Sequence, residues 1–404
     1  MSLTNNTMRD VLVGLGDASK RINEKKIKQW NRGKTKFIGL IQNERRKRLG
    51  IRLDTLRHTT REEVARTTDF GATLRAASSI PANFNSLSVW PLLKSFGVWD
   101  QGQCGDCWAV SAVTVLTYRS AINGLPLLKL SPQPLVSWCT SLPGISDVGT
   151  GPTNGCDGSD LQTPWNFLEQ VGTVPLSVMP MPSSAGPSAC PSVLQNPIKA
   201  ISPPDGYDIT GTQSLTTNRH AIQAEIMARG PVQAAFTVYE DLMQYTGGVY
   251  SPSPGSSIDG GHAIVIIGWG VSENNIPYWI IQNSWGADWG ETFDGQPGNG
   301  TNGGFFRMEM HTAASPLPPG NITSVEMNAY AGYAASGTPK APVVTPSPTP
   351  SPTPSPTPPP TGDNNNPKKS SASPSLDYKT VAIYGGVGIV IFLILFILIV
   401  REKK

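Results

Sequence analysis

Cys107 lies where a polar, glycine-containing turn, Gln101-Gly-Gln-Cys-Gly-Asp, leads directly into the apolar run Trp-Ala-Val-Ser-Ala. That run predicts a buried helix over 108–122, which places the thiol at a helix N-terminus. The positive end of the helix dipole favours the thiolate, the nucleophilic form of cysteine. The pattern favours covalent catalysis, although a buried structural cysteine is also common.

A thiol nucleophile needs a base, and the chain contains four histidines. His262 directly precedes a strand-like apolar run, and the glycines before it allow a partner to approach closely. Asn283 follows the next strand-like run, in Gln-Asn-Ser-Trp-Gly. Adjacent strands can place the two side chains together, so that Asn283 orients the imidazole. Single His and Asn residues are usually structural, so neither signal is strong by itself.

The five cysteines suggest two disulfides and one free thiol. Cys104 and Cys107 form a Cys-x-x-Cys pair, which is also found in redox motifs and zinc sites. A zinc site needs a second close pair of cysteines, which is absent. A redox motif would lie near a βαβ pattern, which the sequence does not show. We therefore expect no metal and no cofactor, and an oxidising compartment.

The apolar patterns predict a helix over 220–229, ended by Gly-Pro, and strands over 232–239, 263–269 and 278–282. Helices dominate the first half of this region and strands the second. The expected fold class is α+β with two lobes.

Charge is distributed unevenly along the chain. Residues 20–77 contain 17 Lys and Arg against 6 Asp and Glu, a net charge of +11, whereas residues 78–334 contain 7 against 18, a net charge of −11. A basic segment can bind nucleic acid or an anionic membrane, but no recognisable nucleic-acid-binding motif is present. We expect it to dock on the acidic domain instead, and its first part, 20–54, to form helix.

Residues 380–400 are 21 residues without charge, rich in Ile, Val, Leu and Phe. At about 1.5 Å per residue, such a helix spans a hydrocarbon core of roughly 30 Å. A buried core helix is the alternative. The basic tail 401–404 would face the cytosol, so the catalytic domain would face a lumen or the outside. We expect a lysosome-like or vacuole-like membrane, or the cell surface.

Residues 335–379 are rich in Pro, Ser and Thr, and alternating proline predicts an extended polyproline-II stalk. Residues 1–19 stay unassigned, because their apolar run is too short for a signal peptide. Either the true start is missing or the chain is tail-anchored with its head in the cytosol. Disulfides favour the first alternative.

These segments closely resemble the papain family of cysteine peptidases, and in detail cathepsin B. The resemblance covers roughly 21–334 and includes Asn85-Ser-Leu-Ser-Val-Trp-Pro and Ala224-Glu-Ile-Met-Ala-Arg-Gly-Pro-Val. It implies a two-lobed papain-like fold, with a helical left lobe and a β-barrel-like right lobe. It also implies an inhibitory pro-segment at 20–77 and a catalytic domain at 78–334.

The resemblance implies a role for each residue of the site. Cys107 is the nucleophile and His262 is the base that forms an ion pair with it. Asn283 orients His262, and Trp285 shields that contact. Gln101 donates to the oxyanion. The implied disulfides are Cys104–Cys156 and Cys139–Cys190, which leave Cys107 free.

The chain departs from the family pattern at several positions. Asp106 replaces Ser or Ala before the nucleophile, where its carboxylate either raises the Cys107 pKa or faces solvent. Ser159 replaces the second glycine of the substrate-binding wall, so Gly158 and Gly261 are expected to bind the substrate backbone. Thr323 is expected at the base of the S2 pocket, which predicts an apolar P2 residue. The stretch 171–190 lacks His and an extra Cys pair, so the occluding loop of cathepsin B is absent.

The sequence therefore predicts a membrane-anchored, monomeric cysteine endopeptidase that is made as a zymogen and cleaves proteins or peptides. We expect acid to weaken the attraction between basic segment and domain, with processing near 76–80. One alternative is a catalytically silent binding protein with the same fold. Another is a different Cys-His enzyme such as a transglutaminase, which would use Asp in place of Asn283.

Overall fold

The computed structural model describes these residues: 29–56, 80–139, 155–182, 188–192, 194–201, 207–210, 215–311 and 324–334. The predicted stalk, spanning segment and cytosolic tail lie outside these ranges, as do Thr323 and residues 1–28. No helix in the described part of the chain is long and apolar enough to cross a membrane. The chain divides into two units, Met1–Val344 and Thr345–Lys404, and every described residue belongs to the first.

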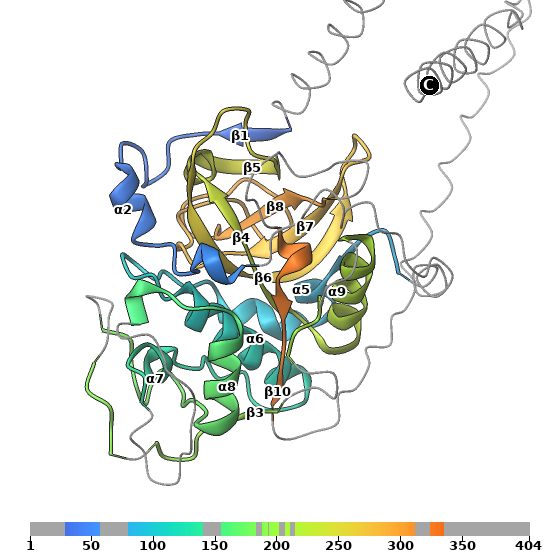
Figure 1. Cartoon of the computed structure of the whole chain (residues 1–404). Coiled ribbons are helices and arrows are strands. Elements are labelled where there is room, and N and C mark those ends of the chain that lie inside the picture. Colours follow the sequence, from blue (N-terminus) through green and yellow to red (C-terminus); the bar gives the residue numbers. More distant parts are fainter. Residues whose placement is uncertain are drawn as a thin grey trace, which may run out of the picture. The chain divides into compact units, whose positions relative to one another are not determined.

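The structure combines helices, short 3-10 turns and strands (Figure 1). The helices are α2 (Gln42–Arg46), α5 (Ser86–Val89), α6 (Cys107–Ile122), α7 (Gln133–Val136), α8 (Gln162–Gln170) and α9 (Leu215–Arg229). The 3-10 turns are η1 (Leu53–Thr55), η2 (Pro91–Phe96), η3 (Gly155–Asp157), η4 (Glu240–Gln244) and η5 (Val325–Met327). The strands are β1 (Trp30–Arg32), β2 (Phe84–Asn85), β3 (Ala200–Ile201), β4 (Val232–Tyr239), β5 (Tyr245–Tyr250), β6 (Ile258–Val271), β7 (Pro277–Gln282), β8 (Phe305–Glu309), β9 (Ala329–Tyr330) and β10 (Tyr333–Ala334).

One large sheet has the order β1-β5-β8-β7-β6-β4-β9, with β2 also paired to β6. Apart from β1 and β2, its strands come from the second half of the described chain. Its long strands β4, β6, β7 and β8 pair antiparallel, and β5 pairs parallel with β8. Every residue of β4 is buried, and β6 is buried along most of its length. The predicted strand over 232–239 is β4, and the other two predicted strands lie within β6 and β7.

The central helix α6 is buried along nearly its whole length. It is rich in Val and Thr, which are mediocre helix formers. Its four Ser and Thr hydroxyls donate to the carbonyl one turn earlier; these residues are Ser111, Thr114, Thr117 and Ser120. Burial therefore supplies the stability that local propensity lacks. The helix begins at Cys107, one residue before the predicted start, and α9 begins five residues before its predicted start.

The described part of the basic segment, 29–56, is called the arm below. The prediction of a helix-forming segment is wrong over most of it, because the arm contains one short helix, α2, and is otherwise extended or in turns. Its strand β1 pairs antiparallel with β5 of the catalytic domain. The apolar residues Trp30 and Phe37 are buried against that domain, so tertiary contacts decide the conformation of the arm.

Candidate active site

Cys107 is the first residue of α6, is fully buried and is the free cysteine among the five. Its Sγ accepts hydrogen bonds from two backbone amides, at 3.3 Å from Ala263 N and 3.2 Å from Gly50 N. Ala263 follows His262 on β6, so this contact brings the strand of the imidazole directly against the thiol. Gly50 belongs to the arm, which therefore covers the sulfur.

His262 and Asn283 are hydrogen-bonded through Nε2 and Oδ1 at 2.8 Å. The ring of Trp285 stacks on the imidazole at 4.8 Å between centroids, and all three residues are buried. Within the described residues, His262 Nδ1 has no hydrogen-bond partner. One ring nitrogen is thus held by the amide, and the other is free for proton transfer with a thiol.

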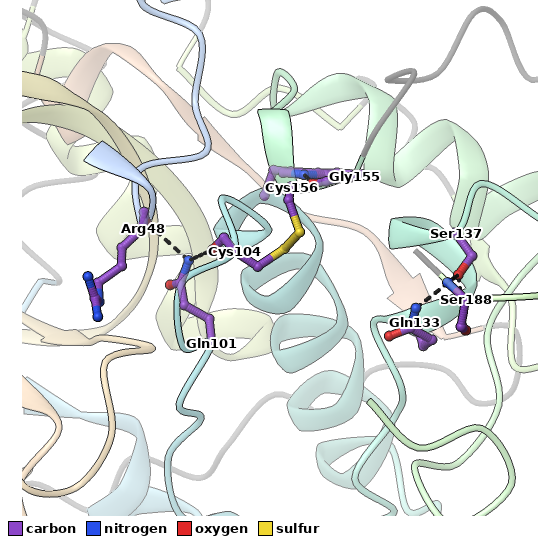
Figure 2. The surroundings of a disulfide bond; sticks show 9 residues. Arg48, Gln101, Cys104, Gln133, Ser137, Gly155, Cys156 and Ser188 are labelled. Atoms are coloured by element: carbon purple, nitrogen blue, oxygen red, sulfur yellow. Dashed lines mark hydrogen bonds between the residues drawn. A yellow bond between two sulfur atoms is a disulfide. The ribbon is translucent and has the colours of Figure 1, made fainter. Parts of the chain in front are cut away.

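Gln101 holds a carbonyl group beside the thiol. Its Nε2 donates to Arg48 O at 3.0 Å and to Cys104 O at 2.8 Å, and Figure 2 shows its amide directed at the Arg48 backbone. Its Oε1 accepts a hydrogen bond from the Ser284 hydroxyl, which fixes the orientation of the amide. A donor that binds a carbonyl oxygen of the arm here is placed to bind the oxyanion of a substrate.

Burial sets the protonation states of the covered site. Burial is the main reason why the pKa of the Cys107 thiol is raised to about 12; the nearby Asp106 carboxylate acts in the same direction, and the amides of Ala263 and Gly50 oppose the shift. Burial also lowers the pKa of His262 to about 4, although the hydrogen bond to Asn283 opposes that shift. Under the arm, the pair is therefore a neutral thiol and a neutral imidazole at pH 7, and not an ion pair.

Asp106 does not face solvent, so the solvent-facing alternative for its carboxylate is wrong, and the alternative in which it raises the Cys107 pKa agrees with the structure. It is the N-cap residue of α6 and is fully buried, yet its side chain makes no capping hydrogen bond. Among the described residues, neither of its carboxyl oxygens has a hydrogen-bond partner. Burial raises its pKa to about 8, so the group is protonated in acid.

The arm crosses the site as an extended strand between two walls of the catalytic domain. Ile51 N donates to Gly261 O at 3.1 Å, Arg52 N donates to Ser159 O at 3.2 Å, and Ser159 N donates to Gly50 O at 3.0 Å. Gly158 has a φ of +89°, and a Cβ there would meet Gly50 O at 2.8 Å. The predicted backbone-binding residues Gly158, Ser159 and Gly261 therefore line one groove, and it holds a peptide strand.

The rest of the arm is bound by charge and by aromatic packing. Its ion pairs with the catalytic domain are Arg32–Asp241 at 3.1 Å, Lys36–Asp100 and Lys36–Asp288 at 2.8 Å, Arg45–Glu240 at 3.3 Å, Arg45–Asp259 at 2.5 Å and Arg52–Asp160 at 3.9 Å. The Phe37 ring packs edge-on against Trp285 at 5.5 Å. The expected docking of the basic segment on the acidic domain is thus realised in these contacts.

The structure contains the disulfides Cys104–Cys156 and Cys139–Cys190, the pairs that the resemblance implies. The first joins the turn before α6 to η3, the start of the wall that contains Gly158 (Figure 2). It therefore fixes the nucleophile turn relative to one side of the groove. In the described part of the chain, no group of three or more His, Cys, Asp or Glu could hold a metal ion.

Sequence reasoning missed the amide of Ala263 and the glycine of the arm, Gly50. Gly50 follows the basic run Lys47-Arg-Leu, and that single glycine in a charged stretch was the available signal. A Cβ at Gly50 would meet Gly105 O at 1.8 Å, so the close approach to α6 requires glycine. Thr323, the predicted S2 residue, lies outside the described residues.

A buried thiol at a helix N-terminus, an imidazole held by an amide and a peptide-binding groove define a thiol hydrolase of papain type. Residues 94–311 match the family model described as papain family cysteine protease. The chain belongs to the papain family of cysteine proteases, and it is a cysteine peptidase.

Several similar curated proteins are named as cathepsin B-like. Over 242 residues, the chain is 36% identical to Cathepsin B-like cysteine proteinase 4 of Caenorhabditis elegans, which covers 53% of this chain and 69% of that protein. Over 239 residues, it is 35% identical to Cathepsin B-like cysteine proteinase of Schistosoma japonicum; the match covers 52% of this chain and 66% of that protein.

Solved structures share the fold. The proCathepsin B S9 of Trypanosoma congolense matches with a TM-score of 0.55 and 23% identity, over 78% of this chain and 97% of that one. The ragweed pollen cysteine protease Amb a 11 in its proform matches with a TM-score of 0.53 and 21% identity, over 78% and 85%. The papain-like α+β fold is therefore established for this chain.

Proposed function

We propose that this chain is a cysteine endopeptidase made as a zymogen, with Cys107 as nucleophile and His262 as base. The observation that carries the proposal is the peptide strand of the arm, held across Cys107 with a carbonyl oxygen on Gln101. A substrate in the same groove places its scissile carbonyl on Gln101. Attack by sulfur forms the acyl-enzyme, His262 protonates the leaving amine, and water releases the acyl group.

The arm blocks this reaction because it presents the wrong atom. The group nearest the sulfur is the amide N–H of Gly50, at 3.2 Å, and not a carbonyl carbon. An amide nitrogen is no electrophile, so the thiol has nothing to attack there. The arm thereby fills the groove, removes water and holds both catalytic groups neutral. The pro-segment is thus an intramolecular inhibitor.

Two aspects of specificity belong to the proposal. Ile51 is buried between the walls formed by Ser159 and Gly261, where an apolar residue of the arm stands for the P2 residue of a substrate. We therefore expect apolar P2 residues, with Thr323 at the base of the pocket. The stretch 171–190 carries no His and no extra Cys pair. Without an occluding loop, the groove has no stop for a chain terminus, which favours endopeptidase activity.

We propose that residues 380–400 anchor the enzyme by a single span, with the catalytic domain lumenal or extracellular. The support is the length and apolarity of that sequence, the basic tail and two disulfides, which need an oxidising compartment. Alkaline extraction of membranes that contain the full chain should leave it in the pellet. A chain that lacks residues 380–404 should be released, and equal release of both would refute the anchor.

The catalytic assignment is tested by an epoxide thiol trap on the full chain, before and after acid processing of the arm. We expect labelling at Cys107 by mass mapping after processing, with little labelling before it, and loss of labelling in His262→Ala. His311→Ala is the matched control, since His311 is a second buried histidine. Absence of labelling after verified removal of the arm would instead identify a silent scaffold.

A further inference from the structure

Carboxylates of the catalytic domain gather beside the start of β6. Glu240 and Asp241 of η4 line a cavity of about 360 Å³, together with Arg32 and Arg45 of the arm. Asp259, near the start of β6, forms an ion pair with the same Arg45. Each of the three carboxylates is paired with an arginine of the arm.

Asp259 holds Arg45 in a two-pronged ion pair. Arg45 Nε donates to Oδ2 at 2.5 Å and Nη2 donates to Oδ1 at 3.0 Å, while Nη2 also reaches Glu240 at 3.3 Å. The Asp259 side chain has no exposed area under the arm, and Arg45 is 14% exposed. This planar, paired geometry is the one by which carboxylates recognise guanidinium groups. Asp259 and Glu240, with the cavity beside them, are called the recess below. The recess already contains a bound arginine side chain, that of Arg45.

A β-bulge directs Asp259 toward this recess. In the pairing of β4 with β6, Val238 faces Gly260 and Tyr239 faces Ile258, so Asp259 is left out of the register. Bulges next to active sites re-aim single side chains. Three residues further along the same strand lies His262, at a distance of roughly 10 Å along an extended chain.

The recess lies on the leaving-group side of the catalytic centre. His262 protonates the leaving amine, so the leaving segment of a substrate begins at His262 and runs over Trp285. The arm follows this route, since Phe37 packs on Trp285 and α2 binds the start of β6 through Arg45 and Arg46. The acyl side, in contrast, is the groove of Ser159 and Gly261.

When the arm leaves, Asp259 loses its cation. Within the described residues, the ion pairs of Asp259 and Glu240 are both with Arg45, so the catalytic domain supplies no substitute of its own. A carboxylate at the edge of the groove then attracts a cation from the substrate. Its neighbour Glu240 strengthens that attraction.

We propose that Asp259, assisted by Glu240, forms a subsite that selects an Arg or Lys side chain within the first three residues after the scissile bond. The inference rests on the proposed function, since it names the substrate class of the same site. In effect, Arg45 of the arm occupies the place of the basic residue of the substrate.

The test uses the processed enzyme and a set of internally quenched peptides. All share one acyl-side sequence with an apolar P2 residue, and each places Arg, Gln or Glu at one of the three positions after the scissile bond. At one position, we expect kcat/KM for Arg to exceed that for Gln by about tenfold or more, with Glu lowest; tenfold corresponds to about 1.4 kcal/mol. Most of the gain should fall in KM, and it should shrink in high salt.

Asp259→Asn should remove the preference for Arg, so that the variant cleaves the Arg and Gln peptides with similar kcat/KM. Glu240→Gln should reduce the preference partly, and Asp259→Glu should restore much of it. The matched control is Glu273→Gln, an exposed carboxylate in the turn after β6, which removes the same charge elsewhere. If Asp259→Asn is poorly made because Arg45 faces an amide, the double variant R45Q/D259N supplies the enzyme.

Two failures can be told apart. Equal rates for Arg and Gln peptides, or a preference that persists in Asp259→Asn, would overturn the subsite while Cys107 still reacts with the thiol trap. No hydrolysis of any peptide and no reaction with the trap would overturn the proposed function itself.

Discussion

Two stretches of the arm bind the catalytic domain by different chemistry. The charged stretch, residues 32–46, is tied down by ion pairs such as that of Arg45 with Asp259. The backbone stretch, residues 48–52, is held mainly by main-chain hydrogen bonds to Ser159 and Gly261, with one long ion pair at its end, Arg52–Asp160 at 3.9 Å. Ion pairs respond to acid and salt, whereas amide hydrogen bonds do not titrate. Blocking the thiol and sensing the environment are thus assigned to separate parts of one segment.

The largest effect is expected from breaking the backbone stretch. Gly50→Ala places a Cβ 1.8 Å from Gly105 O, so the strand cannot close over Cys107. Three main-chain hydrogen bonds at about 1 kcal/mol each are lost, which corresponds to over roughly 100-fold more activity in the uncleaved precursor. The measurement is the initial rate of peptide hydrolysis before any processing is visible on a gel.

Gly39→Ala is the control for that variant. Gly39 is also a glycine of the arm. Its φ of +81°, unlike the φ of Gly50, strains an alanine locally, but nothing lies within 4 Å of its Cβ position. It should keep the precursor latent. Equal activation by both variants would show that the charged stretch, not the closure at Gly50, blocks the site.

An effect of similar size is expected from Arg45→Ala, which removes one partner of a buried ion pair. Such a loss costs about 3 kcal/mol, or on the order of 100-fold. A synthetic peptide of residues 29–56 should therefore inhibit the processed enzyme about 100-fold more weakly, by its inhibition constant. Lys47→Ala, which removes an exposed charge two residues away, should change little. If both weaken inhibition equally, net charge rather than the ion pair matters.

The helix beneath the backbone stretch should respond to pH with the opposite sign. The folded-state pKa of Asp106 is raised to about 8 by burial, so its contribution to stability is complete below about pH 4 and is lost as pH rises to about 8. Between these limits, each pH unit costs about 1.4 kcal/mol of folding free energy. Denaturant unfolding of the inactive Cys107→Ala precursor at pH 5, 6 and 7 measures this slope.

Asp106→Ser should flatten that slope while the fold is kept. It should also extend the activity of the processed enzyme to lower pH, because no carboxylate then raises the Cys107 pKa and the thiolate forms at lower pH. A slope unchanged by the substitution would mean that Asp106 is not the titrating group.

The smallest effect is expected at the exposed end of the charged stretch. Burial tends to raise the pKa of Asp100, but hydrogen bonds from Lys36 and from Gly102 N outweigh it and lower the pKa. This contribution is therefore present above about pH 4 and is lost as pH falls below it. Lys36→Met should weaken the arm by less than about 1 kcal/mol, since such surface pairs contribute little. The inhibition constant of the variant peptide at pH 6 and pH 4 measures the loss, and a tenfold change would be too large for this account.

The central elements could be predicted because each has a strong local pattern. The run after Cys107 predicted α6 to within one residue, and Val232–Tyr239 is the predicted strand. The spatial neighbours of Cys107 followed from the order of strands and from the family resemblance. The arm could not be predicted in the same way, since its conformation depends on Trp30 and Phe37 packing against another part of the chain.

The surroundings of Asp106 could not be predicted from the sequence either. Its sequence position does not tell whether a carboxyl group at a helix start points outward or into the core. Burial of both oxygens is a property of the assembled turn between Cys104 and Cys107. The pocket of Asp259 is similar, because it depends on a register shift that no residue pattern announces.

The cover of Gly50 over Cys107 has a consequence for how the protein is made. The chain must close two disulfides while a fifth cysteine, three residues from Cys104, stays unpaired. Thiol–disulfide exchange requires a thiolate and an open line of attack. Once the arm has closed, Cys107 has neither, because its thiol is buried and its pKa is raised to about 12. Closure of the arm would thus keep this thiol reduced through oxidative folding, as a protecting group does in chemical synthesis.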